Sequence, residues 1–198
     1  KVIDSFKNTM VDILVIDDGS TDETAKIVSG RGVEIISHDR NLGYESSLTT
    51  GFDYACEKNY EYAVSFDADG QMVSEDVFSF IYLAKERQVD LVVGIRDYRN
   101  RFSEYLLSAF GKYRFKIKDP LCGIKLYRLN ACSHLKPFDS KNLVGMEMAF
   151  KMVDNGSTFA EKNISINKRD NASRYGNSIY GELSILKSLF KSVIHFGL

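Results

Sequence analysis

The sequence predicts an α/β fold with a mostly parallel sheet flanked by helices, and the order of its apolar segments leads to that class. Short apolar runs, typical of buried strands, alternate with longer amphipathic segments that are typical of helices. This alternation is the pattern of β-α-β units, whose parallel strands are covered by helices on both faces. The chain has 198 residues, two prolines and no linker-like stretch, so we expect a single domain.

The first half of the chain carries the clearest alternation. Strands are expected over residues 12–17, 33–37, 62–67 and 90–95, and helices over residues 23–29, 45–58 and 77–86. Ser20 and Glu23 have the spacing of a capping box, and Ser74 is expected to cap a helix that begins near Asp76. Residues 1–10 resemble a helix that leads directly into the first strand. We therefore expect that a strand and a turn that would precede this helix are missing from the chain.

The second half begins with a basic, aromatic-rich stretch over residues 96–118, which reads either as an amphipathic helix or as a surface loop. A short strand over 123–128 and a helix around 146–154 follow. Basic residues interleaved with Phe and Tyr suit an anionic membrane surface or single-stranded nucleic acid. Because 26 Lys and Arg residues are balanced by 27 Asp and Glu residues, we expect no nucleic acid partner.

The cysteines and the apolar runs indicate in which compartment the protein works and whether it crosses a membrane. Cys56, Cys122 and Cys132 are odd in number and far apart, so we interpret them as core thiols of a protein in a reducing compartment. No apolar run approaches the roughly 20 residues that span a bilayer. His38, His134 and His195 lack the spacing of a metal site and are interpreted as structural.

Two acidic clusters follow strands of the expected sheet. Asp17 and Asp18 come directly after one strand, and Asp67 and Asp69 end another. In parallel α/β sheets, ligands bind beyond the carboxyl ends of the strands, so both clusters can face one ligand. Carboxylates would repel a phosphate-bearing ligand unless a hard cation lies between them, and Asp67, Asp69 and Gln71 offer ligands for Mg²⁺ or Mn²⁺. The alternative for each cluster is a solvated turn.

Several motifs, in the same order, resemble a known family. They are "VIDDGSTDET", "NLGYESSLTTGFDYA", "VSFDADGQ", "VVGIR", "DPLCGIKLYR", "EMAFKM" and "KRDNASRYG". Together they resemble the inverting glycosyltransferases of the GT-A fold, a Rossmann-like fold, and within them the polyprenyl- or dolichyl-phosphate glycosyltransferase-like group. The resemblance implies a domain over 1–198, with a nucleotide-sugar-binding half over 1–95, an acceptor half over 96–177 and an amphipathic C-terminal helix over 178–198.

The resemblance also implies roles for particular residues. Asp17 and Asp18 would hold the base and ribose of a UDP- or GDP-linked sugar, together with Asn41 and Gly43. Asp67 and Asp69 would contact the donor diphosphate through a metal that Gln71 also binds. Two departures from the family pattern are that Tyr44 stands where related sequences often carry a lysine, and that the family's first strand is missing.

The residues of the second half that take part in catalysis depend on whether the acceptor is a hydroxyl or a phosphate. A sugar hydroxyl needs a base, and Asp119 or Glu147 could take its proton. A lipid phosphate has a second pKa near about 6 and needs cations instead, which Arg96, Arg169 and Arg174 could supply. The sequence favours the phosphate, because "NASRYG" resembles a phosphate-handling loop and the flanking helices suit a membrane surface. For Asp119 the plainer interpretation is a turn residue, and for Glu147 it is a solvated or cap-proximal helix residue.

The C-terminal segment has Leu183, Leu186, Phe190 and Val193 on one helical face, with Lys187 and Lys191 nearby. This pattern predicts either a helix packed on the domain or one that lies on a membrane. We therefore expect a metal-dependent transferase with peripheral contact to the cytoplasmic face of a membrane. The alternatives are a transferase that acts on a glycan hydroxyl, a phosphatase-type hydrolase built on "FDADG", and a catalytically weak binding module of the same fold.

Overall fold

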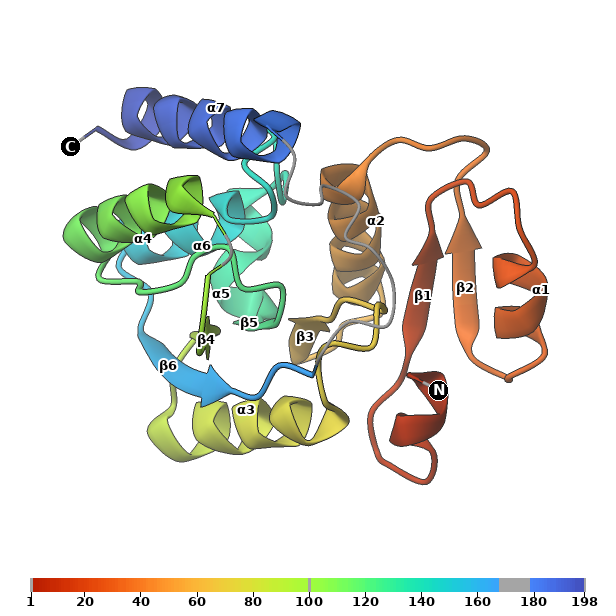
Figure 1. The fold of residues 1–198 in the computed structure, drawn as a ribbon. Coiled ribbons are helices and arrows are strands. Elements are labelled where there is room, and N and C mark those ends of the chain that lie inside the picture. The colour runs from red at the N-terminus through yellow and green to blue at the C-terminus, as the bar shows by residue number, and fades with distance from the viewer. Residues whose placement is uncertain (1, 100, 168–178, 198) are drawn as a thin grey trace.

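A computed structural model describes residues 2–99, 101–167 and 179–197, in which helices and strands alternate along the chain (Figure 1). The first half contains a 3-10 turn and seven further elements: η1 (Ile3–Phe6), β1 (Leu14–Asp17), α1 (Thr24–Ser29), β2 (Glu34–Ser37), α2 (Tyr44–Glu57), β3 (Tyr62–Ser65), α3 (Ser74–Arg87) and β4 (Leu91–Arg96). The second half contains α4 (Phe102–Phe115), β5 (Lys125–Arg128), α5 (Leu129–Cys132), η2 (Ser133–Leu135), α6 (Glu147–Asp154), β6 (Phe159–Ile164) and α7 (Ile179–Phe196).

The strands form two sheets. β1 and β2 pair in parallel, and a separate four-stranded sheet has the order β3, β5, β4, β6. β4 and β6 are parallel, whereas β5 runs antiparallel to both β3 and β4. The predicted α/β class is confirmed. The sequence pattern missed the reversal at β5, because the direction of a strand depends on its connection and not on its own residues.

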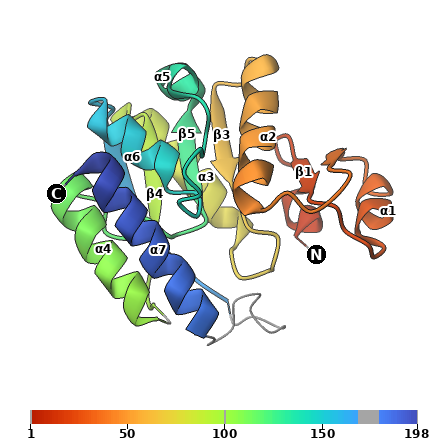
Figure 2. The same ribbon diagram turned by 90° about the horizontal axis from the view of Figure 1, so that it is seen from above.

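Helix α2 connects the two sheets, and it contacts both β1 and β3 (Figure 2). At Gly51 an added side-chain carbon would lie only 3.5 Å from Ile16, so the helix backbone comes close to β1 there. The next residue, Phe52, packs instead on Tyr127 and Phe138, with ring centroids 6.1 Å and 4.9 Å apart. Adjacent residues of α2 thus pack against different sheets.

The core lies on both faces of the four-stranded sheet. Along β4, Leu91 and Val93 point to the face covered by α2, α4 and α6, and Val92 points to the face covered by α3. Phe80 of α3 is fully buried against that second face. The alternation follows from the two-residue period of a strand, and it gives the sheet helices on both sides.

Three local predictions are wrong. No capping box forms, because α1 begins at Thr24 and the amide of Ser20 donates instead to Asp17 Oδ1 at 3.1 Å. α3 begins at Ser74 itself, whose hydroxyl donates to Glu75 and caps no helix. Within residues 2–10, only the short turn η1 replaces the helix expected over residues 1–10.

The basic stretch over 96–118 contains α4, and the expected C-terminal helix is present as α7. β6 was not predicted, because its polar residues hide the strand pattern. Within the described residues, no helix combines the length and apolarity that a membrane crossing requires.

Candidate active site

The end of β1 is shaped by Asp17 and Gly19. Asp17 is buried, and its carboxylate holds the following turn through the amide of Ser20. Gly19 has a φ of +69°, and a side chain there would come within 2.5 Å of the backbone of Arg40. A glycine is therefore required at this position, and it lets the turn after β1 pack against the loop after β2.

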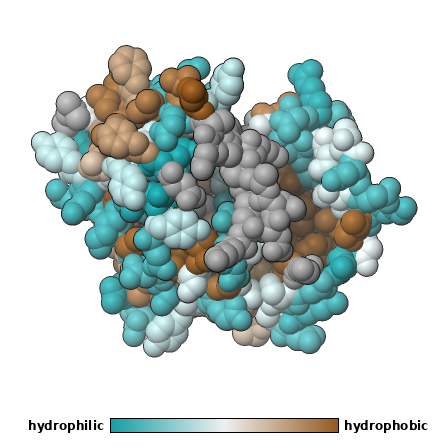
Figure 3. Space-filling model, viewed as in Figure 1, coloured by the Kyte–Doolittle hydropathy of each residue, from teal (hydrophilic) through white to brown (hydrophobic). Residues whose placement is uncertain are grey.

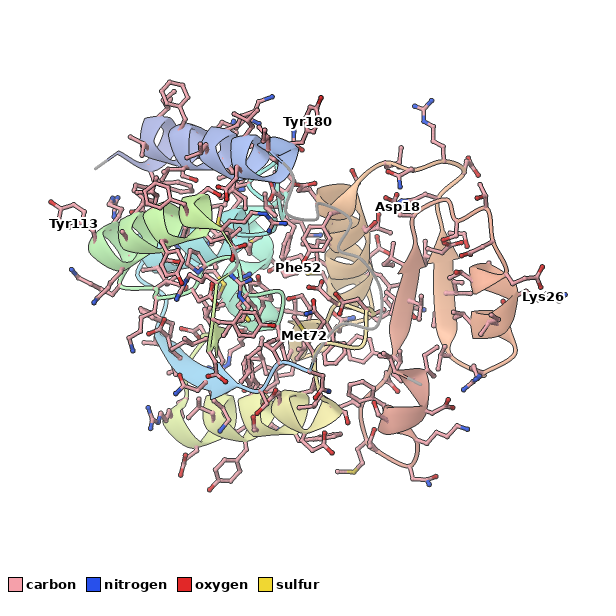
Figure 4. The ribbon with its side chains drawn as sticks, viewed as in Figure 1. Asp18, Lys26, Phe52, Met72, Tyr113 and Tyr180 are labelled. Atoms are coloured by element: carbon pink, nitrogen blue, oxygen red, sulfur yellow. The ribbon has the colours of Figure 1, made fainter. Side chains whose placement is uncertain are left out.

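Asp18 organises that second loop (Figure 4). Its Oδ1 accepts hydrogen bonds from the amide of Leu42 at 2.8 Å and from His38 Nδ1 at 2.9 Å, and its Oδ2 accepts one from the amide of Gly43 at 2.9 Å. Burial alone would raise the pKa of Asp18, but these bonds outweigh burial and lower it. Asp18 is thus an anion that fixes the start of α2, while Asn41 in the same loop is exposed.

His38 lies behind this carboxylate. Since a carboxylate can only accept, His38 Nδ1 carries the proton of their bond, and Nε2 lies 2.9 Å from the hydroxyl of Thr50. His38 is therefore structural, as predicted, but it supports the site. Its position directly after β2, at the carboxyl end of a parallel strand, is the sequence signal that could have identified it.

The second acidic cluster begins with Asp67, two residues beyond β3. The hydroxyl of Tyr44, the first residue of α2, donates to Asp67 Oδ1 at 3.2 Å. Burial first, and the charge of Asp67 second, raise the pKa of Tyr44 well above its usual value, so the phenol keeps the proton that it donates. A side chain at Gly123 would lie 2.0 Å from Asp67 Oδ2, so glycine is needed for this close approach.

The residues around Asp67 fit a hard divalent cation. Asp69 is exposed, and its Oδ1 accepts the amide of Gln71 at 3.0 Å. The three side chains offer only oxygen ligands of the kind that Mg²⁺ and Mn²⁺ prefer. In the part of the chain that the structure describes, no three His, Cys, Asp or Glu side chains form a metal cluster.

The second half of the chain contains a charge cluster that is largely buried. Arg96 ends β4, and it donates to Asp119 from Nε at 2.8 Å, from Nη2 at 2.9 Å and from its own amide at 3.1 Å. Arg96 also pairs with Glu104 at 3.2 Å, and Arg101 pairs with the same carboxylate at 3.0 Å. Sequence reasoning missed Glu104 and Arg101. The signal for Glu104 is a lone acid on the buried face of α4.

Asp119 is fully buried. Burial alone would raise its pKa, but the hydrogen bonds and the charge of Arg96 lower it. The same partnership raises the pKa of Arg96 although burial opposes that charge. A general base works best with a pKa near the working pH, so this bonded anion is poorly suited to take a proton.

A cavity of about 130 Å³ lies beside this cluster, between α4 and α7. Its lining combines charged and apolar side chains. Its lining residues are Arg96, Arg101, Glu104, Leu121, Val144, Gly181, Ser184 and Ile185. The cavity thus brings two guanidinium groups, which are paired with Asp119 and Glu104, next to apolar side chains.

Glu147 is also a buried anion that is already bonded. Its carboxylate accepts hydrogen bonds from the amides of Ser140 and Lys141. It also forms an ion pair with Lys151 at 2.6 Å. Burial would raise its pKa, but these partners lower it to about 2. Burial, and then the contact with Glu147, raise the pKa of the adjacent Asp139 to about 6. The pair shapes the loop over 139–146.

This loop joins the two halves of the site. The amide of Val144 donates to Glu45 of α2 at 3.2 Å, and Gly145 lies against the ring of Tyr44. On its other side, the backbone oxygen of Lys141 accepts Lys191 of α7 at 2.6 Å. The structure thus brings the two acidic clusters and the Arg96 cluster around α2 and this loop. Arg169 and Arg174 lie outside the described residues, and their roles stay predictions.

Comparison with known proteins agrees with this geometry. A family model described as glycosyl transferase family 2 matches residues 1–130. A UDP-N-acetylglucosamine–dolichyl-phosphate N-acetylglucosaminyltransferase of Methanococcus voltae is 31% identical over 113 residues, which cover 48% of this chain and 45% of the relative. A polyprenol monophosphomannose synthase of Mycolicibacterium smegmatis is 24% identical over 208 residues, covering 91% of this chain and 74% of the relative.

A solved structure shows the same fold. Glucosyl-3-phosphoglycerate synthase from Mycobacterium tuberculosis, in complex with Mn²⁺, UDP-glucose and phosphoglyceric acid, matches with a TM-score of 0.75 at 18% identity. The match covers 100% of this chain and 74% of that chain. The architecture is therefore that of the GT-A glycosyltransferases, as the resemblance of the motifs predicted.

Proposed function

Because the chain belongs to glycosyl transferase family 2, we propose that it transfers a sugar from a nucleotide-sugar donor, with inversion, to a polyprenyl phosphate. The names of two relatives support this choice, since both act on lipid-linked phosphates or form their sugar derivatives. A second support is that the two candidate bases, Asp119 and Glu147, are already paired with cations.

The donor lies, in this proposal, at the edge formed by the ends of β1, β2 and β3. Asp17 and Asp18 hold the turns that present Asn41 and Gly43 to the nucleoside of a UDP- or GDP-linked sugar. Asp67, Asp69 and Gln71 would hold Mg²⁺ or Mn²⁺, which would supply positive charge to stabilise the leaving diphosphate.

The acceptor phosphate binds beside Arg96. A phosphate monoester has a second pKa near about 6, so it arrives largely as a dianion and needs no base. It needs fixed cations that hold it against the negative donor, and Arg96 is fixed by Asp119 and Glu104. Arg101, which lines the same cavity, and the predicted Arg169 and Arg174 would complete the set.

One observation carries the choice of a phosphate over a hydroxyl. Asp119 and Glu147, the two acids that a hydroxyl acceptor would need, are both fully buried and already bonded to cations. Their lowered pKa values suit positioning rather than proton transfer. We assign Asp119 the role of orienting Arg96, and Glu147 the role of shaping the loop over 139–146.

We place the reaction at the cytoplasmic face of a membrane. The three cysteines are free thiols, which supports a reducing compartment. A polyprenyl acceptor is itself a membrane lipid, so the enzyme must meet the membrane surface to reach it.

A donor screen tests the proposal. UDP- and GDP-linked sugars are added with Mn²⁺, and the unfolding temperature of the chain is measured. A ligand at a hundred times its dissociation constant adds about 2.7 kcal/mol of stability. The best donor is then incubated with polyprenyl phosphate in detergent, and the lipid is analysed by mass spectrometry. A glycosyl-lipid phosphate is expected, and free sugar as the sole product would contradict the proposal.

A further inference from the structure

We propose that the outer faces of α4 and α7 form one docking surface that lies on an anionic lipid bilayer. The inference rests on the proposed function only for the reason why the protein would bind a membrane. The surface itself is identified from the exposure, spacing and charge of its side chains. Figure 3 shows apolar and aromatic side chains gathered over these two helices.

The apolar residues of the surface follow helical spacing on both helices. On α7, the exposed residues Ile179, Leu183, Leu186, Phe190 and Ile194 recur every three or four positions. On α4, Phe102 and Leu106 are four positions apart and Tyr113 lies two turns further on the same face, with Tyr105 beside them. Phe102 is 72% exposed and Phe190 is 66% exposed. Apolar side chains that gather in this way on the outer faces of two neighbouring helices mark an interaction surface.

The two helices are held in a fixed relation. They lie side by side and run in the same direction (Figures 1 and 2). At their starts, the amide of Ser103 donates to Glu182 at 3.0 Å, and at their ends Arg114 donates to the backbone oxygen of Phe196 at 3.1 Å. Their outer faces, from which Tyr113 and Tyr180 project away from the core (Figure 4), therefore form one rigid surface.

The charge of this surface suits anionic lipid. Lys112 and Lys187 are exposed on the two helices. Both acids of α4 and α7 are engaged within the protein, Glu104 by two arginines and Glu182 by the amide of Ser103. Basic residues beside an apolar helical face are the pattern of helices that lie in a membrane interface.

Two residues that line the cavity beside Arg96 are next in the chain to outer residues of the two helices. Arg101 and Gly181 line the cavity, and each directly precedes or follows an outer residue of the surface, Phe102 and Tyr180. The exposed lysines beside the apolar faces favour a membrane over a second protein molecule as the occupant.

Vesicle binding tests the inference without donor or acceptor. The chain is sedimented with vesicles of phosphatidylcholine alone and with 30 mol% phosphatidylglycerol, a roughly physiological share of anionic lipid. Phe190→Glu should lower partitioning about tenfold or more. Tyr82→Glu on α3 is the matched control, because Tyr82 is 67% exposed and lies away from the surface, so it should bind as the unchanged chain does.

Lysine variants test the charge. Lys112→Gln and Lys187→Gln should each lower binding to the anionic vesicles about fivefold, while Lys26→Gln, exposed on α1, should have no effect. Circular dichroism and donor stabilisation with Mn²⁺ should be unchanged in all variants, which separates this test from failure of the proposed function. Equal binding by Phe190→Glu and the unchanged chain would overturn the proposal. So would a concentration-dependent dimer that Phe190→Glu abolishes.

Discussion

The hydroxyl of Tyr44 donates a hydrogen bond to Asp67 across 3.2 Å and so joins the first residue of α2 to the acidic cluster beyond β3. A neutral donor therefore contacts the carboxylate. The contact orients Asp67 through a neutral hydroxyl, as outer partners orient metal ligands.

Tyr44→Phe should weaken Mn²⁺-dependent binding of the nucleoside diphosphate by about tenfold, because outer partners orient metal ligands. Titration calorimetry measures this affinity. Tyr60→Phe is the matched control, since Tyr60 donates a similar bond to Asp12 at 2.7 Å elsewhere. If both variants bind equally well, the Tyr44 contact has no role in the donor site.

Removal of metal should weaken donor binding more strongly than loss of Tyr44. Without a cation, Asp67 and Asp69 face the donor phosphates with like charge. We expect EDTA and Asp69→Asn each to lower the affinity for the nucleoside diphosphate by about a hundredfold or more, as measured by calorimetry. Equal affinity in EDTA and in Mn²⁺ would remove the metal role assigned to these residues.

Asp119→Asn should destabilise the fold by about 3 kcal/mol, because it leaves Arg96 buried with a weaker partner. It should also lower transfer to polyprenyl phosphate through KM for the lipid, while donor affinity stays unchanged. Urea unfolding and transfer kinetics check the two effects. The control is Asp154→Asn, whose half-exposed pair with Arg114 is worth less than about 1 kcal/mol. Normal lipid KM in Asp119→Asn would contradict the positioning role.

The pair of Asp139 and Glu147 predicts a pH effect on stability. The pKa of Asp139 rises from 3.8 to about 6 on folding, so its contribution to stability is complete below pH 3.8 and is lost as pH rises through about 6. Glu147 acts oppositely, because its pKa falls from 4.5 to about 2. Its contribution is complete above pH 4.5 and is lost as pH falls through about 2.

Asp139→Asn should therefore become more stable, relative to the unchanged chain, by about 1 to 2 kcal/mol as pH rises from 4 to 7. The amide can donate to Glu147 as the protonated acid does. Urea unfolding at several pH values gives the comparison. Asp53→Asn, which alters an exposed pair with Lys136, should show no such trend. A constant difference between Asp139→Asn and the unchanged chain would mean that Asp139 titrates normally.

The local features of the chain could be predicted from sequence, and the contacts between distant segments could not. Strand periodicity placed Asp17, Asp18, Asp67 and Asp69 at the ends of strands, because that pattern is local. The partners of these side chains depend on how the elements meet. Asp18 finds Gly43 25 residues later, and Arg96 finds Asp119 23 residues later.

The reversal at β5 explains the largest gap in the prediction. Because β5 runs between β3 and β4 in the opposite direction, the segment before it brings Gly123 against Asp67 and Asp119 against Arg96. A parallel sheet would not predict either contact. Asp119 is therefore buried against Arg96, and not available as a base, because of the sheet topology. The residues around Asp119 do not by themselves predict that topology.

The central claim is that the acceptor is a lipid phosphate, and a comparison of two lipids tests it most directly. The chain is given Mn²⁺, its best nucleotide-sugar and either polyprenyl phosphate or the polyprenol of the same length, and glycosylated lipid is measured by mass spectrometry. Product should form with the phosphate and fall by a factor of about 10² or more with the alcohol, because the alcohol offers neither a dianion nor a ligand for Arg96. Equal product from the two lipids would contradict the account.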